Sequence, residues 1–410
     1  MKLIISSIFF WIGIYGSMSA TNNKALVICP VADLVAAPIK TFKIASTNKE
    51  SYQKIGLSAG PHQPSVAAPR VHQLLFNEIV EIIKIQKTKD KDENEVCIKV
   101  YNAFFMNQES KKVQTTYWTQ YKNLLPLEEL ERKKVNLHYI PNPPFSTLDK
   151  KSGFPSLVLI KPFFDTQTQT KYSVGTRFVY EVTPSNEYYI YIYDAKSGKF
   201  KKSLLPREYA HINNQNRNQK EFFLQILKGW ANLSDKIAYV LGGCSYTQSP
   251  PDVEFNETLT TLIDGTKIGM YERPNFTTPP LTGFDCTGIL LRAAQIAGIP
   301  YFLKNTSTIL HYLTPLPHNQ TPQEGDLIWI PGHVMVISSI KNNTLIEAAG
   351  YQYGYGVVHE IKLKKVFKQI ETFEQLQQYI LQNLPLIRLN KLGQEVEKIQ
   401  NAKLLTFNFH

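Results

Sequence analysis

Gly283-Phe284-Asp285-Cys286-Thr287-Gly288 stands directly before the clearest helical pattern in the chain. Apolar residues recur from Ile289 to Ala297, and Gly298 and Pro300 then end the pattern, which is typical of an amphipathic helix. The sequence therefore predicts Cys286 at a helix N-terminus. Unpaired N–H groups and the helix dipole favour an anion there, so we expect a thiol with a lowered pKa. The competing interpretation is an ordinary buried cysteine, which is commoner for an isolated one.

Length and composition limit the number of domains, the class of protein and the partners that can be expected. A chain of 410 residues exceeds one ordinary domain, so we expect two or three. Hydrophobic residues make up 43% and aromatic residues 12%, which favours globular domains over disorder. The net charge of +11 comes from scattered lysines, without a zinc-finger or RNP-like signature, so nucleic acid is not an expected partner. A basic exterior fits anionic envelope polymers equally well.

The first twenty residues predict the compartment. Lys2 gives a short positive region, Leu3 to Tyr15 is mostly apolar, and Ser17 to Ala20 offers small residues for cleavage. This is the pattern of a secretory signal peptide over residues 1–20. The apolar run is short for an anchor, and no later segment is long enough to cross a bilayer. We therefore expect secretion across the inner membrane to the periplasm or cell wall, without a stable membrane span.

The cysteines limit the chemistry. There is no C-x-x-C pair and no H-E-x-x-H motif, so neither a zinc site nor another metal cofactor is expected. In an oxidising compartment Cys29 and Cys97 are candidates for a disulfide. Cys286 must stay unpaired if it works as a thiol, which leaves Cys244 as the odd residue.

Two β units are predicted ahead of the cysteine. The first covers 21–140 and the second 141–212, joined by a Pro-rich connector at Pro141–Pro144. Short strands with irregular connections predict small barrels. The clearest strand-like runs are Ala25–Cys29, Glu78–Ile85, Val96–Val100, Arg177–Val182 and Tyr188–Tyr193.

A third domain is predicted over 213–410. It begins after a polar linker with a helix at Glu221–Leu233 and carries a long polar insertion at 245–280. After the Cys286 helix the pattern changes to antiparallel strands, which predicts an α+β domain. The later elements are expected as strands at Gly325–Ile330, His333–Ile337, Thr344–Ala348 and Leu386–Leu389, with a helix at Val366–Leu381.

A cysteine nucleophile needs a base and a group that orients the base. His333 follows Pro331-Gly332 at the start of a predicted strand, where a turn can present its side chain. Glu347 lies on the returning strand and is the candidate third residue. Each has an ordinary alternative, since a lone histidine is often structural and a strand glutamate often faces solvent.

Four motifs in this order resemble the NlpC-type cysteine peptidases of bacterial cell walls, a papain-like family. They are Tyr239-Val240-Leu241-Gly242-Gly243, Asp285-Cys286-Thr287-Gly288, Gly325-Asp326-Leu327 and Gly332-His333-Val334, and the resemblance covers roughly residues 221–367. It implies an α+β fold, with a papain-like catalytic domain preceded by two small SH3-like β-barrels. It also implies Cys286 as nucleophile, His333 as general base and Tyr239 at the oxyanion hole.

The chain departs from the family in two respects. The third catalytic residue is usually His, Asn or Gln, whereas this chain has Glu347, whose carboxylate can still orient His333 and stabilise its cation. The segment between Gly243 and Gly283 is also much longer than usual, and we expect it to border or cover the cleft.

The two β units resemble the bacterial SH3 domains that precede this peptidase core. In relatives that cleave γ-D-glutamyl bonds, an acidic residue of the first SH3 domain and the Asp before the nucleophile bind the substrate ammonium. By resemblance these are Glu78 and Asp285, with Thr287 and Ser307 lining the same pocket. A desolvated ammonium does need a carboxylate partner. For Glu78 and Ser307 an ordinary surface role is an equal alternative.

The resemblance implies a monomeric secreted peptidase that needs no cofactor. Its substrates would be peptidoglycan or muropeptide fragments, cleaved at the D-γ-Glu to diamino acid bond of stem peptides with a free N-terminal L-Ala. Two other functions stay open. One is a wall-binding protein with a degenerate peptidase core, and the other is an acyltransferase that passes the acyl group to an amine.

Overall fold

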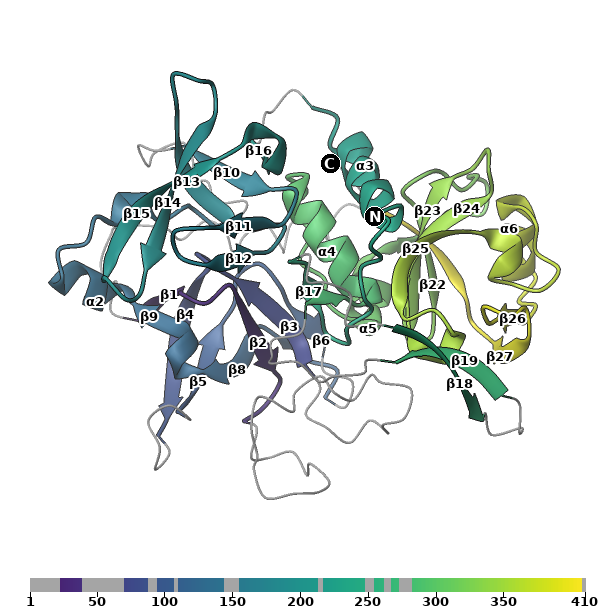
Figure 1. Cartoon of the computed structure of the whole chain (residues 1–410). Coiled ribbons are helices and arrows are strands. Elements are labelled where there is room, and N and C mark those ends of the chain that lie inside the picture. Colours follow the sequence, from purple (N-terminus) through teal and green to yellow (C-terminus); the bar gives the residue numbers. More distant parts are fainter. Residues whose placement is uncertain are drawn as a thin grey trace.

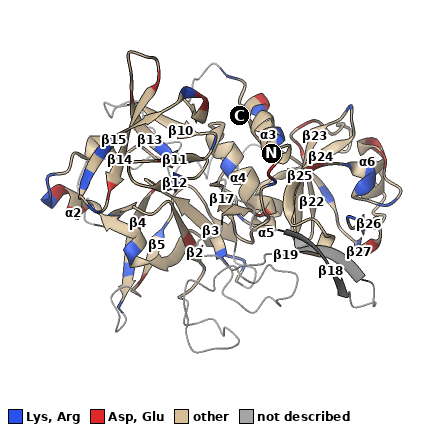
Figure 2. Cartoon of the chain, viewed as in Figure 1, with Lys and Arg blue, Asp and Glu red and all other residues tan. Residues whose placement is uncertain are grey.

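The computed structural model describes residues 23–38, 70–87, 94–106, 110–143, 155–212, 217–247, 254–261, 267–272 and 282–407. The predicted signal peptide at 1–20 therefore lies outside the described residues. Two helices near the middle of the molecule separate the two β units from a further sheet (Figure 1). No helix in the described ranges is long and apolar enough to cross a membrane. Lysines and arginines are spread over elements of all the large sheets (Figure 2).

The first β unit is a seven-stranded antiparallel sheet in the order β3-β2-β8-β5-β4-β1-β9. Its strands are β1 (Lys24–Val27), β2 (Val31–Val35), β3 (Arg70–Leu75), β4 (Ile79–Gln86), β5 (Glu95–Lys99), β8 (Thr116–Gln120) and β9 (Leu124–Pro126). The short strands β6 (Phe105–Met106) and β7 (Val113–Gln114) pair with each other, and α2 (Leu127–Arg132) follows the sheet. The predicted strands at Ala25, Glu78 and Val96 are confirmed.

The second β unit is a five-stranded sheet in the order β15-β14-β13-β10-β16. Its strands are β10 (Ser156–Leu159), β13 (Arg177–Val182), β14 (Tyr188–Asp194), β15 (Lys199–Leu205) and β16 (Ala210–His211), and β11 (Phe163–Asp165) pairs with β12 (Thr170–Tyr172) beside it. The strands predicted at Arg177 and Tyr188 are confirmed.

The prediction of two closed SH3-like barrels is wrong. A barrel requires its end strands to pair, but within the described residues β3 and β9 are the two ends of one open sheet, and β15 and β16 of the other. The apolar faces are buried differently. Phe76 of the first unit packs with Phe178 of the second, and Val158 and Val174 join the core around the central helices. Each sheet thus buries its face against neighbouring elements instead of closing on itself.

The C-terminal part is built on a six-stranded antiparallel sheet in the order β21-β28-β22-β23-β24-β25. Its strands are β21 (Thr314–Pro315), β22 (Leu327–Ile330), β23 (His333–Ser339), β24 (Thr344–Ala349), β25 (Val357–Lys362) and β28 (Lys403–Thr406). The helices α3 (Gln219–Ala231) and α4 (Cys286–Ile296) share a core with Val334 and Val336, on one face of β23. Met335 and Ile337, on the other face, pack with residues around α6 (Phe373–Leu381).

The predicted α+β, papain-like fold class is wrong as well, because the chain is mostly β and its sheets are antiparallel. The sequence placed the helix at Cys286 correctly but overestimated the helix expected from Val366, which begins only at Phe373. It also predicted one strand after α6, where the structure has three: β26 (Leu386–Leu389), β27 (Glu395–Ile399) and β28. Strand β28 returns to pair with β22, which widens the sheet.

The insertion predicted at 245–280 is framed by a short pairing of β17 (Cys244–Ser245) with β20 (Gly283–Phe284). Between them, β18 (Glu254–Thr261) and β19 (Lys267–Glu272) form an antiparallel pair. The rest of the insertion lies outside the described residues, so its role at the cleft stays a prediction.

Candidate active site

Cys286 is the first residue of α4, as the sequence predicts. The Asp285 carboxylate caps the helix by accepting hydrogen bonds from the N–H groups of Thr287 and Gly288, which are otherwise without helical partners. The expected lowering of the thiol pKa is wrong. Cys286 is only 7% exposed, and its burial, together with the nearby Asp285 charge, raises the pKa to about 12. At neutral pH the sulfur therefore carries its proton.

His333 is positioned by a tight hairpin. Pro331 and Gly332 connect β22 to β23, and Gly332 has a φ of +80°, which suits the second central position of a type II turn. Ile330 and His333 are paired across this turn. The backbone of the next residue, Val334, lies close enough to the Cys286 sulfur to lower the pKa of the thiol, against the larger effect of burial. The start of α4 and the start of β23 therefore meet at the cysteine.

Glu347 lies on β24 with its side chain directed at His333. The Nε2 atom of His333 is 2.7 Å from Oε2 of Glu347, and both side chains are buried. The structure thus brings together the base and the third residue that the sequence proposed. Because Glu347 engages Nε2, the remaining ring nitrogen, Nδ1, is the one that can exchange a proton with a thiol.

Two further residues contact Glu347 that sequence reasoning missed. Arg388 on β26 donates to both carboxylate oxygens at 2.8 and 2.9 Å, and Nε2 of His359 on β25 is 3.1 Å from Oε1. Burial alone would raise the pKa of Glu347, but Arg388 and the two histidines hold that pKa well below its usual range. No local sequence pattern indicates His359 or Arg388, because each contacts Glu347 only in the folded structure.

Tyr239 lies beside the start of α4. Its backbone N–H donates to the Gly356 carbonyl at 2.7 Å, and the residue forms a parallel bridge with Phe284, two positions before Cys286. The residue is half-buried at the edge of the core. The motif at Tyr239 and the motif at Cys286 are therefore adjacent in the structure.

Asp285 already holds an internal cation. The ammonium group of Lys304 is 2.7 Å from each oxygen of the Asp285 carboxylate, and it also donates to Thr287 Oγ1 at 3.2 Å. Thr287 in turn donates to Asp285 at 2.9 Å. Sequence reasoning missed Lys304, which was not part of any motif. Ser307 is half-buried in α5 (Thr306–Tyr312), two residues after the Asn305 cap.

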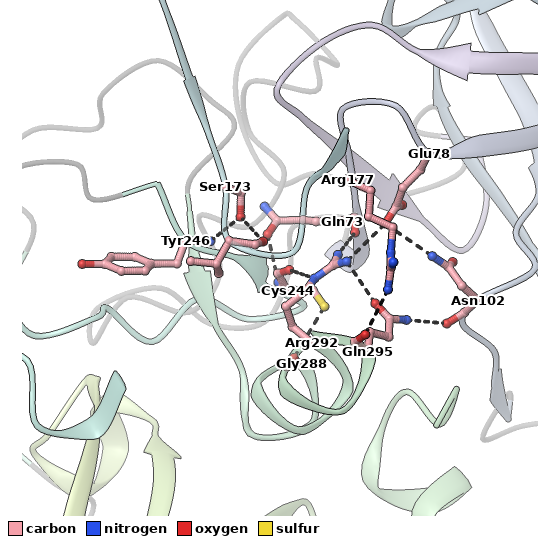
Figure 3. A network of polar contacts seen from close by, with 11 residues as sticks. Gln73, Glu78, Asn102, Ser173, Arg177, Cys244, Tyr246, Gly288, Arg292 and Gln295 are labelled. Carbon is pink, nitrogen blue, oxygen red and sulfur yellow. Dashed lines mark hydrogen bonds and ion pairs between the residues drawn. The ribbon is translucent and has the colours of Figure 1, made fainter. Parts of the chain in front are cut away.

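Glu78 holds a second internal cation. Figure 3 shows Arg292 of α4 at the centre of a polar network that joins the helix to the first β unit. Arg292 donates to Glu78 Oε1 at 3.2 Å, to the Gln73 carbonyl at 3.4 Å and to the Cys244 carbonyl at 3.0 Å. Asn102 donates to the same Glu78 oxygen at 3.3 Å. Glu78 and Asp285 therefore each have a cation of the chain's own.

The remaining cysteines are free thiols. Cys29 and Cys97 do not form the predicted disulfide. Cys244 is buried, and its thiol donates to the Gly288 carbonyl at 3.5 Å, so it packs against the first turn of α4. Within the described ranges no group of three or more His, Cys, Asp or Glu side chains has the arrangement of a metal site.

Comparisons of the chain with protein-family models, with curated proteins and with solved structures gave no match. The geometry around Cys286 and Glu347 is therefore the basis on which a chemistry can be assigned.

Proposed function

We propose that the chain is a cysteine peptidase that hydrolyses amide bonds in peptidoglycan stem peptides. The observation that carries this proposal is the junction of two elements. The Val334 backbone lies close to the Cys286 sulfur, and His333, the residue before Val334 in the chain, has its Nε2 atom 2.7 Å from the buried carboxylate of Glu347. A thiol, a base and an orienting group are what nucleophilic catalysis requires.

The first half of the reaction begins from the neutral thiol. His333 Nδ1 takes the proton of Cys286 as the sulfur attacks the amide carbon, because a thiol with a raised pKa needs a base at the moment of attack. The carbonyl oxygen becomes an oxyanion, stabilised by the Cys286 N–H and by Tyr239. The C–N bond then breaks, His333 gives its proton to the leaving amine, and a thioester remains on Cys286.

The second half returns the enzyme to its starting state. His333 removes a proton from water as the water oxygen attacks the thioester carbon. The tetrahedral intermediate collapses with cleavage of the C–S bond, and the proton goes back to the sulfur. Glu347 stays ionised throughout, because its role is to orient His333 and stabilise the imidazolium that forms in each half.

The substrate class rests on the motif resemblance, the N-terminal signal-like segment and the basic surface. The bond proposed is that between D-γ-Glu and a diamino acid. A requirement for a free N-terminal L-Ala has less support, because Asp285 and Glu78 already pair with Lys304 and Arg292. Asp285, whose two carboxylate oxygens both bind Lys304, gains little from a substrate ammonium, whereas Glu78 binds Arg292 through Oε1 alone.

Digestion of the peptide L-Ala-γ-D-Glu-diamino acid, followed by mass spectrometry with and without an added amine, tests the proposal. We expect the dipeptide L-Ala-D-Glu and the free diamino acid, in yields that do not depend on the amine. A product that incorporates the amine would indicate an acyltransferase instead. Binding of wall fragments without any cleavage would indicate the degenerate, wall-binding alternative.

A further inference from the structure

The carboxylate of Glu347 is saturated with donors. Oε2 lies 2.7 Å from Nε2 of His333 and accepts from Arg388 Nη2 at 2.9 Å. Oε1 lies 3.1 Å from Nε2 of His359 and accepts from the same Arg388 nitrogen at 2.8 Å. An ionised carboxylate has about four lone-pair sites and no donor, so these contacts use its whole capacity. The side chains of Glu347 and Arg388 are both 0% exposed.

Arg388 is itself held rigidly from the far side. Its guanidinium carbon lies 4.4 Å from the centre of the Tyr353 ring, and Nη1 donates to Met335 Sδ at 3.4 Å. The Tyr353 hydroxyl donates to Glu397 at 3.0 Å, which anchors the ring over the cation. A stacked guanidinium with directed N–H groups is pre-organised in a way that a lysine ammonium is not. The cation is therefore built into the protein core at a defined position.

We propose that Arg388 is a positioning residue that keeps Glu347 ionised and thereby fixes the tautomer of His333. The inference rests on the proposed function, in which His333 is the base. An ionised Glu347 can only accept, so His333 must carry its proton on Nε2, and Nδ1 is left with a free electron pair. That electron pair is what takes the proton of Cys286.

Without Arg388 the ring proton of His333 would move from Nε2 to Nδ1. A buried carboxylate that lacks a cation takes up a proton, because burial penalises its charged form. A protonated Glu347 donates to Nε2 of His333, which places the ring proton on Nδ1. A ring with its proton on Nδ1 cannot accept one from Cys286 there. The loss of one buried cation would thus disable the base without moving it.

Arg388 also balances the charge of Glu347. The two side chains form a buried pair without net charge. The other ionisable groups facing this pair are His333, His359 on β25, Tyr355, and Tyr353 with its partner Glu397.

The tautomer is measured directly by ¹⁵N NMR of histidine-labelled protein, a readout that does not depend on any substrate. In the wild type at neutral pH we expect His333 to be protonated on Nε2. Protonation on Nδ1 would overturn the proposal, whether or not the protein is a peptidase. If the tautomer is as expected but stem peptides are not cleaved, the inference stands and the proposed function fails.

Two substitutions and a control extend the test. Arg388→Met should shift the His333 proton to Nδ1 and lower kcat by about 100-fold or more with little change in KM. The loss should be larger near about pH 6 than near about pH 9, because alkali restores the carboxylate. Arg388→Lys keeps the charge and should recover part of the activity. A wild-type tautomer and pH profile in a folded Arg388→Met protein would contradict the proposal.

The control is His359→Asn, which removes one donor from Oε1 and leaves Arg388 in place. We expect the wild-type tautomer at His333 in this variant. A shift of the proton to Nδ1 in His359→Asn as well would assign the effect to general loosening around Glu347 and would overturn the specific role of Arg388.

Discussion

Lys304 and Asp285 form a buried ion pair at the N-terminus of the helix that carries Cys286. The Lys304 ammonium is 2.7 Å from both carboxylate oxygens, and the side chain is only 2% exposed. The same carboxylate caps the helix through the Thr287 and Gly288 N–H groups. Asp285 thus combines helix capping with neutralisation of a buried cation, two structural roles that the motif alone did not indicate.

Lys304→Met should destabilise the protein strongly, because it leaves the Asp285 charge buried without a partner. Breaking such a pair costs about 3–5 kcal/mol. The matched control is Lys368→Met, whose ion pair with Glu395 is half exposed and should contribute at most about 1 kcal/mol. Chemical denaturation of both variants measures the difference. Equal effects of the two substitutions would contradict a structural role for Lys304.

Under the proposed function, the same ion pair predicts how the protein treats the amine of a stem peptide. Because Lys304 already occupies the Asp285 carboxylate, we expect similar kcat/KM values for a free stem tripeptide and its N-acetylated form. Parallel digestion of the two peptides measures this. A strong preference for the free amine would contradict the prediction and return the ammonium-binding role to Asp285 and Glu78.

Gly175→Ala should be more destabilising than Gly393→Ala. Both glycines have positive φ angles, +85° and +78°, so each alanine pays about 1–2 kcal/mol for backbone strain. A Cβ at Gly175 would also lie 2.3 Å from Cδ of Arg292, whereas none of the described atoms lies within 4 Å of a Cβ at Gly393. This clash should add about 1–3 kcal/mol. Equal free energies of unfolding for the two variants would show that the Arg292 side chain moves aside without cost, and would contradict the prediction.

His72 predicts a loss of stability in acid. It is fully buried, neither ring nitrogen has a hydrogen-bond partner, and its burial, with Lys304 and Arg292 nearby, lowers the pKa well below the ordinary value. The unfolded chain takes up a proton there below about pH 6.5, whereas the native state does not. Stability contributed by neutral His72 is therefore present above that pH and lost as the pH falls.

His72→Phe should remove this dependence. Between about pH 6.5 and pH 5 the wild type should lose about 2 kcal/mol through His72, and the variant should not. His211, whose pKa is lowered to about 4 mainly by burial, adds a further acid sensitivity that both proteins share. Unfolding curves at several pH values measure the slopes. Parallel slopes for the two proteins would contradict the prediction.

The sequence predicted local elements better than their assembly. The helix at Cys286 and the strands at His333 and Thr344 follow from apolar periodicity and turn residues, and all three are confirmed. The barrels and the papain-like class failed because alternation shows which side of a strand is buried but not which strand is its neighbour. The prediction of a lowered pKa for the Cys286 thiol is wrong because burial raises the pKa by more than the helix N-terminus lowers it.

The partners of the candidate site were the least predictable. His333 and Glu347 could be proposed because a turn joins their strands. Arg388 is 41 residues beyond Glu347 and reaches it through β26, on the face opposite to α4. Lys304 lies in the loop between α4 and α5, outside every predicted motif. A buried cation is placed by the tertiary structure, and nothing in its own sequence neighbourhood indicates it.

The measurement that tests the central claim most directly is cleavage of L-Ala-γ-D-Glu-diamino acid by the wild type and by Cys286→Ala, with binding measured in parallel. Loss of the sulfur removes the only proposed nucleophile, so kcat/KM should fall by at least about 10⁴-fold while the peptide still binds. The intact mass of the wild type during turnover should also show an acyl adduct on Cys286. Full activity of Cys286→Ala would contradict the account.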